Sequence, residues 1–88
     1  MSYFVYILIT YSKNRYFSYV GYTSDIKKRI NAHNSSKGAK FTRGRKWKLI
    51  FKKKYKTKSE AMKAEIEFKK NISFRNRVKN KFINNVDK

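Results

Sequence analysis

Hydrophobic residues near the start of the chain form two runs, over residues 3–9 and 16–22, with a polar segment at residues 10–15 between them. Both runs are rich in Val, Ile, Phe and Tyr, which favour strands, so we expect a hairpin with strands over residues 3–10 and 16–22. A glycine inside a strand, here Gly21, usually marks a bulge or a close approach of another group. Aromatic side chains in strands most often belong to a core, so the tyrosines of this hairpin do not by themselves indicate a function.

A short helix is expected directly after the hairpin. Three typical N-cap residues, Thr, Ser and Asp, precede Ile26, and the apolar positions that follow recur at helical spacing as far as Asn34. Arg29 and His33 are four positions apart and therefore share one face of this helix, close to the end of the second strand. The alternative for each is a solvated side chain or a local hydrogen bond.

The second half of the chain predicts one strand and two helices. Near-alternation of apolar and basic residues over 47–55 predicts a third strand. A capping box from Thr57 to Glu60 predicts a helix that runs to about Asn71, and a basic amphipathic helix is expected over about residues 73–86. The apolar stripe of the first of these helices comprises Ala61, Ala64, Phe68 and Ile72. At 88 residues the chain is expected to form one domain, with its core over about residues 3–70 and the basic C-terminal helix after it.

Glu65 stands out because it falls inside that apolar stripe, between Ala61 and Phe68. Burying an ionised carboxylate costs free energy unless the group is paired with a cation or bound to a metal. A salt bridge to Lys69, one turn later, is the simpler interpretation. The other acidic residues occupy capping, terminal or differently oriented positions, so Glu65 is also the best candidate metal ligand in the chain.

The charge of the chain indicates a polyanionic partner. It has 24 Lys and Arg against 5 Asp and Glu, a formal net charge of +19 that opposes compaction unless counterions or a polyanion offset it. Residues 37–46 form a basic, glycine-containing loop suited to phosphate contacts, although a merely solvated loop is the alternative. The expected nucleic-acid contacts are Lys28, Lys40, Arg43, Arg45 and Lys46. The sequence has no long apolar stretch, signal-like start or lipidation motif, so a membrane partner is not expected.

The composition also excludes several kinds of site. Without cysteine there is no thiol nucleophile, disulfide or cysteine-based zinc site, and with one histidine there is no pair of histidines for acid–base work. Five carboxylates make a multi-carboxylate metal cluster hard to build. A catalytic site would therefore rely on Tyr, Arg, Lys, the single His and one acid. The absence of cysteine fits the cytoplasm or another reducing, DNA-containing compartment.

Two tripeptides of the hairpin stand in a fixed order with three later polar residues. The ordered set consists of Phe4-Val5-Tyr6, Tyr19-Val20-Gly21, Arg29, His33 and Glu65. With this order and spacing, and with a similar loop over residues 38–45, the chain resembles the GIY-YIG nuclease superfamily, especially its short single-domain members. The resemblance covers residues 3–70. It implies an α+β fold in which helices flank a three-stranded antiparallel sheet (β-β-α-β-α, then the C-terminal helix), and a metal-dependent endonuclease that hydrolyses phosphodiester bonds in DNA.

The resemblance also implies a role for each residue of the set. Glu65 would hold Mg²⁺ or Mn²⁺, Arg29 would balance charge on the scissile phosphate, and Tyr6 would take the proton from the attacking water, with Tyr19 and His33 lining the site and Gly21 as a structural residue. A phenol with a pKa near 10 is a weak base at neutral pH unless the metal and Arg29 favour the phenolate. His33 stands where tyrosine is common in the family. Some branches also use an asparagine, for which Asn71, Asn76 and Asn80 are possible counterparts here, and that role is left unassigned.

Two other functions remain open at this stage. The chain could be a nucleic-acid-binding module that keeps the fold without cleaving, or a ribosome-associated basic protein, although neither explains Glu65 in an apolar stripe. No added DNA-recognition domain is expected, which favours a structure-directed or weakly sequence-selective nuclease, as in DNA repair or recombination. RNA as the substrate and an additional protein partner are not excluded.

Overall fold

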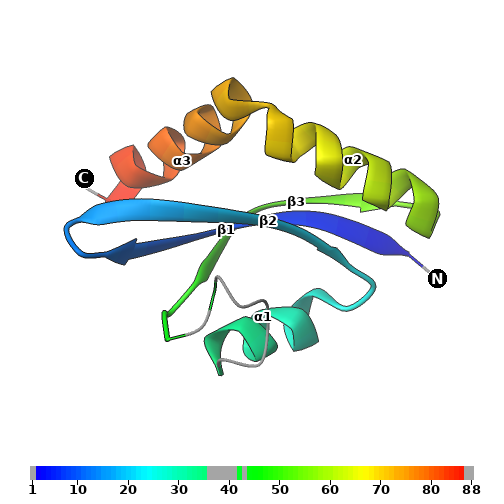
Figure 1. Cartoon of the computed structure of the whole chain (residues 1–88), viewed down its shortest axis with the longest axis horizontal. Helices are drawn as coiled ribbons and strands as arrows, with labels where there is room; N and C mark the ends of the chain where they lie inside the picture. Colours follow the sequence, from blue (N-terminus) through cyan, green and yellow to red (C-terminus); the bar gives the residue numbers. More distant parts are fainter. Residues whose placement is uncertain (1, 36–41, 43, 87–88) are drawn as a thin grey trace.

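The fold consists of a three-stranded sheet with helices on both faces. The computed structural model describes residues 2–35, 42 and 44–86 of the chain. The elements are β1 (Tyr3–Ser12), β2 (Arg15–Thr23), α1 (Ile26–Asn34), β3 (Lys48–Tyr55), α2 (Lys58–Lys70) and α3 (Ile72–Val86). In Figure 1, α2 and α3 lie over one face of the sheet and α1 lies against the other. The α+β class, the antiparallel sheet and the order of the elements confirm the sequence prediction.

The sheet has the order β2-β1-β3, and both pairings are antiparallel. The central strand β1 is buried on both faces over residues 5–10, as its continuous apolar run predicts. Lys13 and Asn14 have positive φ angles of 53° and 67°, which is the conformation of a two-residue hairpin turn. Because this turn needs only two residues, strand pairing continues to Ser12 and Arg15, beyond the predicted strand ends.

Alternate side chains of β1 point into two separate cores. On the face of α2 and α3, Val5 and Ile7 pack with Val20, Ala61 and Ala64. On the face of α1, Tyr6 and Leu8 pack with Trp47, against a second set of half-buried side chains: Phe17, Tyr19, Ile26, Ile30 and Leu49. The two-residue period of a strand therefore assigns Tyr6 to the α1 face.

The predicted helix caps are present. The Asp25 carboxylate accepts the backbone N–H of Lys28, and the Thr57 hydroxyl accepts that of Glu60. None of the described helices is long and apolar enough to cross a membrane.

The break between α2 and α3 corrects one detail of the sequence prediction. Asn71 follows the end of α2, and its side-chain oxygen accepts the backbone N–H of Phe74, which caps the start of α3. Ile72, which we expected in the buried stripe of α2, is 61% exposed. The helical spacing that placed Ile72 in that stripe does not continue through the change of chain direction at Asn71.

Candidate active site

The site is built around a close approach of Tyr6 to Gly21. These two residues are paired across β1 and β2, so their side-chain positions lie on the same face of the sheet. The phenol ring occupies the space next to the glycine: a Cβ added to Gly21 would lie 2.6 Å from Tyr6 Cζ and even nearer its hydroxyl. Gly21 is therefore required for its missing side chain, which lets the ring lie over the edge strand β2 while Tyr6 stays 1% exposed.

Two side chains of α1 meet the Tyr6 hydroxyl. His33 Nε2 lies 2.9 Å from it, and Arg29 Nε donates to it at 3.4 Å. Tyr19, on β2, packs its ring edge-on to His33 at a centroid distance of 5.0 Å and lies 6.4 Å from the Tyr6 ring. Four of the residues expected from the sequence therefore form one connected cluster.

Burial raises the pKa of the Tyr6 phenol to about 12. The hydrogen bond from Arg29 acts in the opposite direction, but it does not offset the loss of solvation. The phenol is therefore fully protonated at neutral pH. Arg29 by itself does not make Tyr6 a base, so a further positive charge would be needed near the hydroxyl.

His33 is completely buried, and both of its ring nitrogens have partners. Nε2 faces Tyr6, and Nδ1 lies 2.8 Å from the hydroxyl of Thr42. Burial, together with the positive charge of Arg29, lowers the pKa of His33, so the ring is neutral at pH 7. A neutral imidazole has one donor and one acceptor nitrogen. Tyr6 and Thr42 therefore bond to the ring in opposite senses: one donates to it and the other accepts from it.

Thr42 is a site residue that sequence reasoning missed. Its side chain is completely buried, and its backbone oxygen accepts a hydrogen bond from Trp47 Nε1 at 3.0 Å. The only signal in the sequence is an uncharged hydroxyl residue inside a basic loop. That signal is weak because exposed loops commonly carry threonine.

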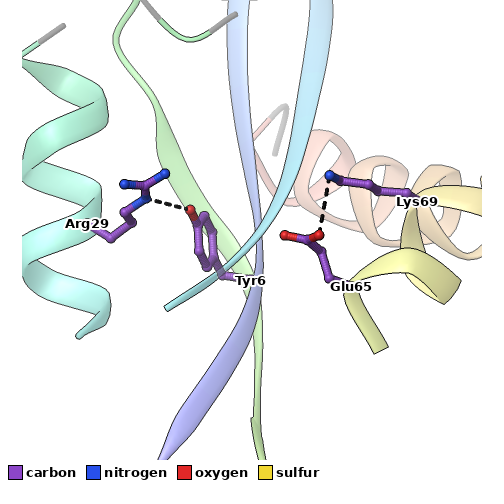
Figure 2. A network of polar contacts seen from close by, with 4 residues as sticks. All are labelled: Tyr6, Arg29, Glu65 and Lys69. Atoms are coloured by element: carbon purple, nitrogen blue, oxygen red, sulfur yellow. Dashed lines mark hydrogen bonds and ion pairs between the residues drawn. The ribbon is translucent and has the colours of Figure 1, made fainter. Parts of the chain in front are cut away.

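Glu65 reaches the same region from the opposite face of the sheet. Figure 2 shows Tyr6 and Arg29 on one side of β1 and β2, with Glu65 and Lys69 on the other. Lys69 Nζ lies 3.4 Å from Glu65 Oε1, so the salt bridge that offered the simpler interpretation of Glu65 is present. The Lys69 side chain is 53% exposed, and such an ion pair contributes only about 0–1 kcal/mol. A stronger cation could therefore replace it.

An open cavity of about 500 Å³ at this edge of the sheet is lined by residues from both faces. It is lined by Tyr3, Tyr6, Tyr19, Gly21, Tyr22, Ser24, Arg29, Lys58 and Glu65. The structure thus brings together the expected site residues, with His33 behind Tyr6 instead of in the lining. Tyr3, Tyr22, Ser24 and Lys58 were not expected, because their types are ordinary for strands and helix starts.

Glu65 is the one carboxylate in this lining. Among residues 2–35, 42 and 44–86, no group of three His, Cys, Asp or Glu side chains could hold a metal ion. Mg²⁺ commonly binds one or two carboxylates and completes its coordination with water and substrate phosphates. Carboxylate oxygens are also among the hard donors that this ion prefers. The lining therefore fits an ion held by Glu65 and largely by water and substrate.

The predicted nucleic-acid contacts are spread over several elements. Lys28 is exposed on α1 and, with Arg29, lines a second hollow of about 400 Å³. Lys46 is exposed, and the guanidinium of Arg45 stacks on a ring of β2. Lys40 and Arg43 lie outside the described residues.

Comparison with known proteins gives consistent matches to one family. The model of the GIY-YIG catalytic domain matches residues 2–80. A UPF0213 protein of Streptococcus agalactiae is 52% identical over 52 residues, which are 58% of this chain and 59% of that protein. The UPF0213 protein YazA of Bacillus subtilis is 53% identical over 59% of this chain and 54% of its own length. The chain thus spans less than two thirds of these relatives.

Two other relatives match over a longer part of the chain. A UPF0213 protein of Bacillus velezensis is 44% identical over 77% of this chain and 67% of its own length. A UPF0213 protein of Bacillus halodurans, determined by solution NMR, is 41% identical, covers 78% of this chain and 71% of its own, and superposes with a TM-score of 0.42.

Replacing Gly21 with Ala should displace the Tyr6 ring, because the new methyl group would occupy its position. Overpacking of this kind costs about 1–3 kcal/mol of unfolding free energy, which urea denaturation measures. Ser18→Ala, at a β2 position paired with Ile9 instead of Tyr6, is the matched control and should change stability by less than about 0.5 kcal/mol. Equal stability of the Gly21→Ala variant and the parent would contradict the close approach.

The pH dependence of stability should report on His33. Its pKa is lowered in the folded protein, so the unfolded chain binds more protons below the ordinary value of 6.5. The stabilisation that the neutral, buried His33 ring gives is complete above pH 6.5, and it is lost as the pH falls through the pKa of His33 in the folded protein. Since the chain has one histidine and carboxylates titrate lower, urea denaturation from pH 7.5 to 5 isolates this effect. A His33→Gln variant should lack the decline; the same slope in both proteins would contradict the buried neutral ring.

Proposed function

The chain belongs to the GIY-YIG nuclease superfamily, and from this membership and the site we propose that it is a metal-dependent endonuclease that hydrolyses phosphodiester bonds in DNA. The observation that supports this most is the convergence of Tyr6, Arg29 and Glu65 on one cavity from three different elements. A phenol, a guanidinium and a carboxylate provide a proton acceptor, a phosphate-binding cation and a metal ligand. Phosphodiester hydrolysis needs these three functions.

In the proposed reaction, Arg29 binds a non-bridging oxygen of the scissile phosphate and Tyr6 takes the proton of the attacking water. A pKa of about 12 makes the Tyr6 hydroxyl too weakly acidic to be ionised at neutral pH. Mg²⁺ or Mn²⁺ held by Glu65 would supply positive charge that lowers this pKa and stabilises the charge developing on the phosphoryl oxygens. Tyr19 then lines the cavity and packs against His33.

His33 and Thr42 are suited to stabilising the ionised form of Tyr6. A phenolate is an acceptor only, so it is best held by two donors, which here are Arg29 Nε–H and His33 Nε2–H. His33 has the proton on Nε2 only when Nδ1 accepts a hydrogen bond, and the hydroxyl of Thr42 is in position to donate one. When Tyr6 is protonated, its hydroxyl donates to His33 Nε2 and His33 Nδ1–H donates to the Thr42 hydroxyl. The imidazole ring therefore stays neutral in either state.

DNA is the substrate that we propose, with structure-directed or weakly sequence-selective recognition. The net charge of +19 supports a polyanion, and the basic residues near the cavity, such as Lys28 and Lys58, are suited to phosphates instead of base edges. Lysine ammonium groups on exposed elements bind a charged backbone in a sequence-independent way. DNA and RNA oligonucleotides of the same sequence, compared in one assay, decide between the two nucleic acids.

A non-catalytic nucleic-acid-binding module is the second candidate. The observation in its favour is that Glu65 already has a cation partner in Lys69. In such a module the salt bridge is structural, and Tyr6 remains a buried, protonated phenol. Binding that weakens with salt is common to both candidates, whereas metal-dependent turnover belongs to the nuclease alone.

Replacing Glu65 with Gln should abolish cleavage while leaving DNA binding intact. Labelled single-stranded, duplex, flapped and branched DNA are incubated with and without Mg²⁺ or Mn²⁺, and products are separated on a denaturing gel. We expect metal-dependent cutting by the parent and a rate lower by roughly 100-fold or more in Glu65→Gln, because the charge stabilisation from a bound metal is worth several kcal/mol.

The matched control for this experiment is Glu67→Gln. Glu67 lies on the same helix, loses the same charge and is exposed, outside the cavity lining, so this variant should cut like the parent. Cleavage by Glu65→Gln at the parental rate would show that Glu65 does not hold the metal. Tight binding by the parent without cutting under either metal would favour the binding module.

A further inference from the structure

The ion pair between Lys69 and Glu65 joins an exposed cation to a carboxylate of the cavity lining. The two residues are one turn apart on α2, and Lys69 Nζ lies 3.4 Å from Glu65 Oε1. The Glu65 side chain is only 17% exposed, whereas that of Lys69 is 53% exposed. In Figure 2 the ammonium lies beside the carboxylate, on the side of β1 and β2 away from Tyr6. One cation of the protein therefore already neutralises the carboxylate that we propose as the metal ligand.

The Lys69 ammonium and a metal ion would compete for this carboxylate. Glu65 is the one carboxylate that lines the cavity, so a metal ion held there takes its remaining ligands from water and substrate. A divalent cation and an ammonium on the same carboxylate repel each other. The attraction between Lys69 and Glu65 is weak by comparison, because the lysine is largely in water. Binding of the metal therefore favours release of the ammonium.

The Lys69 side chain can leave Glu65 while the helix stays in place. Lys69 is not part of the cavity lining, and its four-carbon stem is flexible and more than half exposed. Its backbone oxygen accepts a hydrogen bond from Arg75 Nη2 at 3.0 Å, but that bond does not involve the side chain. The ammonium can thus turn into solvent without breaking this contact between α2 and α3.

The other charges of the cavity act in the same direction as Lys69. Arg29 and Lys58 also line the cavity, so its lining has two positive charges against the one negative charge of Glu65. A divalent cation is repelled from such a lining until an anion, such as a DNA phosphate, offsets the excess. Lys69 adds a third positive charge, and it is the one in contact with the carboxylate.

We propose that Lys69 is an internal competitor of the metal ion: its ammonium occupies the Glu65 carboxylate in the metal-free protein and is displaced when the metal binds. This inference rests on the proposed function for the role of Glu65. The ion pair compensates a poorly exposed carboxylate while no metal is present. It also keeps the affinity for free metal low, so the ion is loaded mainly together with the substrate, whose phosphates supply further ligands.

Lys69→Gln should therefore bind metal more tightly than the parent. Mn²⁺ is the probe, because the electron paramagnetic resonance signal of the free ion falls on binding, and a titration without DNA involves no cleavage. The Kd for Mn²⁺ should decrease by roughly 3- to 5-fold, the range expected on removal of one exposed competing ion pair. Gln and Lys have similar helix propensities, so α2 is expected to be preserved.

Two control variants separate competition from a general effect of charge. Lys70→Gln loses the same charge from the same helical turn, but Lys70 is exposed and outside the cavity lining, so the Kd should stay within about 1.5-fold of the parental value. Lys69→Arg keeps a cation that can pair with Glu65, so it should bind Mn²⁺ no more tightly than the parent. A parental Kd in Lys69→Gln, or equal tightening in Lys70→Gln, would overturn the proposal.

Glu65→Gln in the same titration separates this inference from the proposed function. Loss of Mn²⁺ binding in Glu65→Gln, with equal Kd values for the parent and Lys69→Gln, would exclude competition and leave the metal role of Glu65 intact. A parental Kd in Glu65→Gln would show that the ion is held elsewhere and would exclude both. Binding detected in Lys69→Gln but too weak to detect in the parent supports competition, whereas binding detected in neither excludes it.

Discussion

The close approach of the Tyr6 ring to Gly21 is the constraint on which the site depends. It requires the register that pairs these two residues across β1 and β2, and it requires that β2 be an edge strand so that a cavity can open beside it. A shift of one residue in the register would turn the phenol to the other face of the sheet, away from Arg29 and His33. The hairpin turn and the two cores, which fix this register, therefore also fix the position of the catalytic candidates.

The polar groups around Tyr6 form a buried cluster that is satisfied in its neutral form. Every described hydrogen bond of the cluster joins neutral or cationic groups: Tyr6 with His33, His33 with Thr42, and Arg29 with Tyr6. No anion lies within this cluster, and burial keeps the phenol protonated and the imidazole neutral. The arrangement is thus stable without ionisation, and added positive charge would make Tyr6 more acidic, with its partners changing only their donor and acceptor roles.

The chain has many more cationic than acidic side chains, so few of its own carboxylates would compete with a bound polyanion for the lysines and arginines. With five carboxylates in 88 residues, most lysines and arginines have no acidic partner to pair with. Two arginines instead stack on Phe17, and the ammonium of Lys69 pairs with Glu65. Exposed cation–π contacts and ion pairs of this kind each contribute only about 1 kcal/mol or less.

The sequence by itself determined the elements and singled out several of the residues that meet at the cavity. Strand propensities, cap residues and apolar periods are local properties, and they predicted the hairpin, α1 and the capping box of α2 nearly to the residue. It also identified Glu65, because an acid in an apolar stripe conflicts with its local pattern. Local patterns extended one prediction too far, at Ile72, since α2 ends at Lys70 and the Asn71 side chain caps the start of α3.

Tertiary structure decided what depends on contacts between distant segments. Thr42 was not recognisable as a partner of His33, because only the folded chain brings its hydroxyl to the imidazole ring and its backbone oxygen to Trp47. The pKa of Tyr6 likewise depends on burial, which outweighs Arg29 and reverses the direction expected from charge alone. Arg15 and Arg45 share a ring because the chain returns to the hairpin tip after α1. These three features depend on burial and on contacts between residues far apart in the sequence, which no local sequence pattern specifies.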